Sequence, residues 1–147
     1  MGYREASSSY KETRIKTAGQ GQLIVMMYDG AIKHLTRAIE LLNENQGEKK
    51  DPASIEMISK AIMKTEEIIT EFMISLDFDQ GGEIAKNLFS LYTWFNRELL
   101  EANISQDVQR IVNVKNMLSE LRNTWSEVST NAAAQTNREA VGLNIAG

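Results

Sequence analysis

Residues 22–43 read QLIVMMYDGAIKHLTRAIELLN, and this stretch decides the fold. Placed on a helix at about 100° per residue, its apolar side chains cover roughly half of the circumference, more than the ~100° stripe of a simple bundle helix. Val25 and Met26 fall outside even this arc. The stretch therefore predicts a helix that either contacts several neighbours or keeps apolar surface for a partner.

Three more amphipathic stretches follow, separated by short polar breaks. We predict helices over residues 52–76, 83–102 and from 105 or 107 to 128. Pro52 preceded by Asp51 is typical of a helix start, and the glycine pair Gly81-Gly82 is typical of a turn. The third helix again has a wide apolar arc, which includes Phe89 and Leu100, and places Trp94 among polar side chains. Four helices with short connections predict an all-α fold, an antiparallel four-helix bundle.

The two ends of the chain differ from this bundle. The first 20 residues are polar apart from a few side chains that include Tyr10, and we predict a short segment that packs on the bundle as a removable cover. Residues 1–130 are predicted to form one domain. Residues 131–147 are rich in Ala and Asn, and we expect a flexible tail.

The composition excludes most chemistry. The 147 residues include no cysteine and one histidine, His34, so thiolate sites and two-histidine metal sites cannot form within one chain. Asp77-x-Asp79 resembles the start of a calcium loop, but Gly81 and Leu88 occupy positions that need oxygen ligands. We predict no catalytic, cofactor or metal site, and keep an oxygen-ligand metalloenzyme as a remote alternative.

Charge and hydropathy restrict the classes of partner that the chain can bind. The net charge of −4 argues against nucleic acid, and the longest apolar run is far shorter than the roughly 18 residues of a membrane span. No secretory signal precedes the first helix, so we expect a cytosolic protein. Of the seven methionines, Met27 and Met73 lie on predicted core stripes, whereas Met26, Met57 and Met63 lie off them and suit adaptable apolar binding.

Four motifs resemble one known family in order and spacing. They are Thr17-Ala18 with Leu23–Ile32, then Ser75–Tyr92, Leu99–Ile104 and Leu118–Trp125. Together they resemble the FliS family, the flagellin-specific export chaperones of bacterial flagella, over residues 10–128. The segment Gly19-Gln20-Gly21-Gln22 departs from the Ser-Pro-acidic helix start that is common in that family, so it is a weaker cap.

The resemblance implies a non-enzymatic, cytosolic chaperone. It would bind the disordered C-terminal segment of flagellin, prevent premature polymerisation and assist delivery to the flagellar type III secretion apparatus. It also implies that the N-terminal segment packs on the bundle until flagellin displaces it. On the wheel, Val25, Met26 and Trp94 lie off the core and Tyr28 lies at the edge of the apolar arc. From these positions and the resemblance, the candidate contacts are Tyr10, Leu23, Val25, Met26, Tyr28 and Trp94.

Two alternatives stay open from the sequence. The apolar surplus could instead serve homodimerisation in a structural or regulatory helical bundle. The resemblance also leaves open a monomer or a homodimer, and a flagellar export-gate component or an anti-sigma factor as a second partner.

Overall fold

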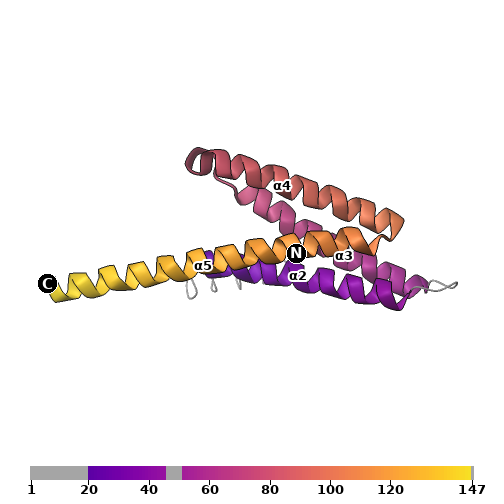
Figure 1. Cartoon of the computed structure of the whole chain (residues 1–147), viewed down its shortest axis with the longest axis horizontal. Helices are drawn as coiled ribbons and strands as arrows, with labels where there is room; N and C mark the ends of the chain where they lie inside the picture. Colours follow the sequence, from indigo (N-terminus) through magenta and orange to yellow (C-terminus); the bar gives the residue numbers. More distant parts are fainter. Residues whose placement is uncertain (1–19, 46–50, 147) are drawn as a thin grey trace, which may run out of the picture. The chain divides into compact units, whose positions relative to one another are not determined.

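Four helices make up the described chain. The computed structural model describes residues 20–45 and 51–146, with side chains within 21–45 and 51–131. The helices are α2 (Gln20–Glu44), α3 (Pro52–Ser75), α4 (Phe78–Ser105) and α5 (Val108–Ala146) (Figure 1). Within the described ranges there is no strand, and none of the helices is long and apolar enough to cross a membrane. The predicted all-α fold is confirmed.

The described chain divides into two compact units. One is Tyr28–Ser119, and the other combines the described parts of Met1–Met27 and Glu120–Gly147. In the first unit all four helices supply fully buried side chains: Leu35, Ile62, Leu99 and Leu118, one from each of α2, α3, α4 and α5 in turn. Within it α3 and α4 lie side by side in opposite directions (Figure 1). A core shared by four helices agrees with the predicted four-helix bundle.

Two aspartates set the starts of α3 and α4. The Asp51 carboxylate accepts a hydrogen bond from the Ala53 amide (3.1 Å), with Pro52 at the first helical position. The Asp77 carboxylate accepts from the amides of residues 79 and 80, so α4 begins at Phe78 rather than at the predicted residue 83. The predicted break is a kink inside α4, where Gly82 has φ 50° and ψ −124°.

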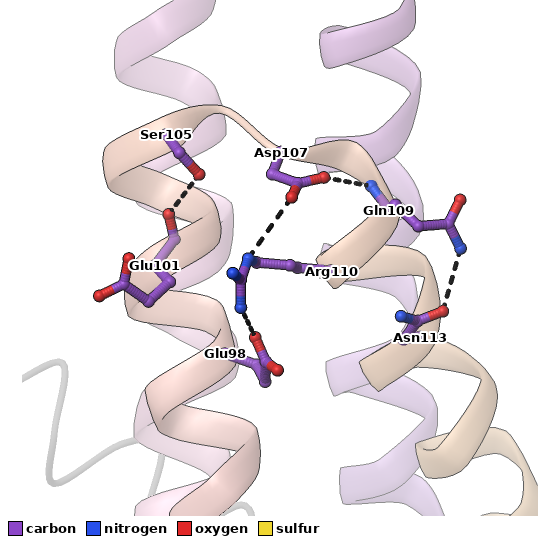
Figure 2. A network of polar contacts seen from close by, with 7 residues as sticks. All are labelled: Glu98, Glu101, Ser105, Asp107, Gln109, Arg110 and Asn113. Carbon is purple, nitrogen blue, oxygen red and sulfur yellow. Dashed lines mark hydrogen bonds and ion pairs between the residues drawn. The ribbon is translucent and has the colours of Figure 1, made fainter.

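A polar network closes the turn between α4 and α5. Gln106 adopts the left-handed conformation (φ 56°), and its amide donates to the Ala102 carbonyl. The Asp107 carboxylate accepts from the Gln109 amide (3.0 Å), and Arg110 pairs with both Asp107 and Glu98 (Figure 2). Of the two caps considered for the fourth helix, Ser105 and Asp107, the structure selects Asp107.

Helix α5 continues well beyond the predicted end at residue 128. It runs without interruption to Ala146 (Figure 1). The expected boundary at residue 130 is therefore not a helix end, because the Ala-rich sequence that follows Ser129 has enough helix propensity to extend the same helix. A flexible tail over residues 131–147 stays a prediction.

Candidate partner-binding surface

An aromatic cluster joins α2, α3 and α4 inside the Tyr28–Ser119 unit. The Tyr28 side chain is 0% exposed, and its ring stacks on Phe72 with centroids 4.4 Å apart. The hydroxyls of Tyr28 and Tyr92 are 2.5 Å apart, and Phe72 also lies against Tyr92 at 5.5 Å. Burial raises the pKa of Tyr92, and the hydrogen bond to Tyr28 acts in the opposite direction. Each of these two buried hydroxyls thus has the other as a hydrogen-bond partner in the core.

Tyr28 therefore lies in the core, and the interpretation that placed it at the edge of the apolar arc is wrong. Its hydroxyl finds its partner 64 residues away, on α4, and such a non-local pair has no signature in the periodicity of one helix. A tyrosine with a satisfied hydroxyl packs like a large apolar residue. A partner could reach this side chain only if the bundle opened.

Trp94 marks the surface end of the same cluster. Its ring lies 5.8 Å from Phe95, and Phe95 lies 6.3 Å from Tyr92. The Trp94 side chain is half-buried rather than fully exposed as the wheel suggested. The structure thus connects two predicted site residues, Tyr28 and Trp94, through shared aromatic neighbours, with only Trp94 accessible to solvent.

Leu23, Val25 and Met26 lie on the first turns of α2, in the other unit, and all three are half-buried. Gly21 sits so close to α5 that a Cβ atom there would come within 2.5 Å of the Ser129 hydroxyl. Val25, four residues after Gly21, shares this α5-facing side, whereas Leu23 and Met26 lie on the opposite side of the helix. The sixth predicted contact, Tyr10, lies outside the described residues.

The most exposed large apolar side chains are different residues. They are Met57, Met63, Ile74, Phe78, Ile84, Phe89, Leu100, Ile104 and Val128. The off-core placement of Met57 and Met63 is confirmed. Phe89 and Leu100 were assigned to the apolar arc of the third helix, yet both are exposed, because that arc is wider than the bundle can cover. The arc width was the signal that could have found them.

Ionisable groups show no catalytic arrangement within the described residues. No three His, Asp or Glu side chains there converge as a metal site would require. Partial burial lowers the pKa of His34, helped by the nearby cations of Lys64 and Lys33. Partial burial raises the pKa of Glu66. These two shifts lie on separate helices, His34 on α2 and Glu66 on α3.

Comparison with known proteins identifies relatives along most of the chain. Residues 3–132 match the family model described as "Flagellar protein FliS". The flagellar secretion chaperone FliS of Salmonella typhimurium is 37% identical over 127 residues, which cover 86% of this chain and 89% of that protein. The protein of the same name from Escherichia coli is 31% identical over 116 residues, covering 79% of this chain and 80% of that protein.

A more distant relative extends the same pattern. The flagellar secretion chaperone FliS of Bacillus subtilis is 23% identical over 127 residues, covering 86% of this chain and 88% of that protein. The resemblance drawn from the four motifs is confirmed by these matches. Because the family match spans the bundle and the start of α5, and relatives above 30% identity align over most of both chains, this chain belongs to the FliS family of flagellar proteins.

Proposed function

We propose that this chain is a flagellar secretion chaperone that binds the disordered C-terminal segment of flagellin. Bound in this way, flagellin would not polymerise prematurely, and the chaperone would assist its delivery to the flagellar type III secretion apparatus. The observation that carries the proposal is the 37% identity, over most of both chains, to a protein named as a flagellar secretion chaperone. The role is non-enzymatic and needs no cofactor, and it places the chain in the cytosol, where flagellin is made.

The accessible apolar side chains support this proposal. A disordered segment that folds on binding loses several kcal/mol of conformational entropy, so it needs a long apolar track to compensate. Helical anchors laid against apolar helix faces supply such a track. Each of the half-buried side chains of Leu23, Met26 and Trp94 keeps exposed surface that a partner can still cover.

The remaining predicted contacts have different roles in the proposal. Val25 shares the α2 side that faces α5, so we assign it to packing first and to partner contact second. Tyr28 acts through the aromatic cluster that positions Trp94. Tyr10 belongs to a cover that flagellin displaces. An export-gate component or an anti-sigma factor is a further candidate partner of the same chaperone.

Inhibition of flagellin polymerisation tests this function. Purified flagellin monomers are seeded, and filament growth is followed by light scattering with and without an equimolar amount of this chain. We expect growth to be suppressed, and Met26→Lys to relieve the suppression. Met57→Lys, the same change on an exposed part of α3, is the matched control and should suppress like the wild type. Growth unaffected by the wild-type chain would contradict the proposal.

A further inference from the structure

Basic side chains gather along the line where α2 and α3 meet, on a surface that we name the α2–α3 basic patch. Its members are Lys33, His34 and Arg37 on α2 and Lys60 and Lys64 on α3. All five belong to the Tyr28–Ser119 unit. The patch holds four of the nine Lys and Arg side chains that the structure describes, although the whole chain carries a net charge of −4. None of its members is a predicted flagellin contact, so the patch needs its own explanation.

Two contacts show how α2 and α3 align. The Asp51 amide donates a hydrogen bond to the Asn45 side chain (3.1 Å), which holds the end of α2 beside the start of α3. Further along both helices, a Cβ atom added to Gly30 would lie 3.8 Å from the Ile68 side chain. The two helices are therefore antiparallel neighbours, and each step toward the end of α2 is a step toward the start of α3.

This alignment brings the members of the patch to two neighbouring levels. One helical turn from the close approach of the two helices, His34 lies nearly level with Lys64. About one turn further, Arg37 lies nearly level with Lys60. Partial burial, and then the nearby cations of Lys64 and Lys33, lower the pKa of His34, which agrees with this placement. The levels are about 6 Å apart along the helices, and the axes of packed helices are roughly 8–10 Å apart.

Half of the cations in the patch are free to pair with a partner. Two of the four have a carboxylate partner about one turn away on their own helix. These pairs are Arg37–Glu40 (3.4 Å) and Lys60–Glu56 (3.5 Å). Both pairs are exposed to solvent, so each contributes little to stability and can give way to another carboxylate. Within the described ranges, Lys33 and Lys64 have no ion-pair partner.

An exposed apolar side chain continues the patch toward the start of α3. Met57 lies three residues before Lys60 on the same side of the helix, and its side chain is 47% exposed. The flexible, polarisable thioether of methionine suits contact with an apolar side chain of a partner. A ligand that covers the whole surface therefore combines carboxylates with an apolar anchor.

We propose that the α2–α3 basic patch, with Met57 at its edge, binds an acidic helical segment of a partner protein. Carboxylates four residues apart on a helix lie about 6 Å apart along its axis, which matches the distance between the two levels of the patch. An apolar residue one turn away on the same face of that helix then lies against Met57. The partner is distinct from the flagellin segment, whose proposed contacts are other residues.

The carboxylates around the patch favour a short acidic segment over a phosphate polymer or an anionic bilayer. Exposed acidic side chains border the patch on both helices: Glu40 and Glu44 on α2, Glu56 and Glu67 on α3. A wide anionic surface, such as a duplex or a bilayer, would bring its phosphates against these carboxylates, whereas a single helix covers only the patch. The same small footprint predicts weak binding that depends strongly on ionic strength.

Fluorescence anisotropy with a designed peptide tests the proposal. The probe is a labelled, Ala-rich helix with blocked ends, and one face carries Leu at position i and Glu at i+3, i+4, i+7 and i+8. In the control peptide, Gln replaces Glu. We expect the full chain to bind the Glu peptide at low ionic strength, and the Gln peptide at least about tenfold more weakly.

A pair of charge-reversed variants shows where the peptide binds. Lys33→Glu/Lys64→Glu changes two exposed side chains and should weaken binding of the Glu peptide by about tenfold or more. Lys86→Glu/Arg97→Glu, at exposed positions of α4, is the matched control. It should weaken binding much less, because it changes the net charge equally but leaves the patch intact.

His34 reports occupancy from within the patch, because it is the only histidine of the 147 residues. The charged groups that face it are Lys33 and Arg37, with Glu40, on α2 and Lys64 and Lys60, with Glu56, on α3. Carboxylates of a bound peptide raise the pKa of the imidazole, so its NMR titration should move to higher pH in the saturated complex. By linkage, the Glu peptide should bind more tightly at about pH 5.5 than at about pH 7.5, and His34→Gln should remove this difference.

Several outcomes would overturn the proposal. One is equal binding of the Glu and Gln peptides, or no saturable binding of either. Another is a His34 pKa that the bound peptide leaves unchanged. Tighter binding of a single-stranded DNA oligonucleotide, or of phosphatidylglycerol vesicles, that is lost in Lys33→Glu/Lys64→Glu would assign the patch to nucleic acid or membrane. Loss of flagellin binding in the same variant would assign the patch to the export substrate.

Discussion

The buried hydroxyl pair between α2 and α4 makes a sharp prediction about Tyr28. Tyr28→Phe keeps the ring that stacks on Phe72 but removes the partner of the Tyr92 hydroxyl, which is in a side chain only 2% exposed. Leaving a buried hydroxyl without a partner costs about 1–3 kcal/mol. For a chain of this length, each kcal/mol lowers the melting temperature by about 2–4 °C.

Urea unfolding followed by circular dichroism measures the effect, with the double variant Tyr28→Phe/Tyr92→Phe completing a double-mutant cycle. We expect the double variant to be less destabilised than the sum of the two single variants, because it also removes the Tyr92 hydroxyl that Tyr28→Phe leaves without its partner. Ser90→Ala, which removes an exposed hydroxyl from α4, is the matched control and should change little. Flagellin affinity should be unchanged by Tyr28→Phe. An additive cycle, or a Tyr28→Phe variant as stable as wild type, would refute the buried pair.

Three further predictions concern stability. His34→Gln should flatten the pH dependence of urea unfolding. The folded-state pKa of His34 lies below its ordinary 6.5, so the stability of the wild type falls as the pH drops through 6.5. A wild-type stability that is constant from pH 7.5 to 5 would contradict this. Gly82→Ala should destabilise by about 1–3 kcal/mol in a thermal melt, because its φ of 50° and ψ of −124° suit only glycine, and an unchanged melt would contradict the kink. Gly30→Ala should stabilise the folded chain by up to about 1 kcal/mol, because alanine has the higher helix propensity and an added Cβ on this α2 residue would lie 3.8 Å from its nearest neighbour, Ile68. A destabilised variant would show that the space around Gly30 is too small for the methyl group.

Local signals predicted the helices well. The apolar period of 22–43 and the Asp51-Pro52 start are properties of neighbouring residues, and both agree with α2 and α3. The start of α4 was missed by five residues, because Asp77 caps one helical turn before the break at Gly82. The length of α5 was missed because a polar, Ala-rich segment has helix propensity without an apolar stripe.

The candidate site was harder to predict, because burial depends on which helices meet. Tyr28 was assigned to the edge of the apolar arc from its wheel position, but Tyr92 and Phe72 come from other helices and enclose it. The exposure of Phe89 and Leu100 likewise depends on which side of α4 packs against the other helices, and the periodicity of one helix does not show this. The wide apolar arcs indicated that some apolar side chains would stay exposed, but only the packing of the helices decides which ones.

Isothermal titration of the full chain with a peptide of the flagellin C-terminal segment tests the central claim most directly. We predict saturable binding of one peptide per chain, with a negative heat-capacity change because apolar surface is buried as the peptide folds. A scrambled peptide of the same composition should give no saturable heat. Absence of binding by the C-terminal peptide, or equal binding of the scrambled one, would contradict the assignment of this chain as a flagellin chaperone.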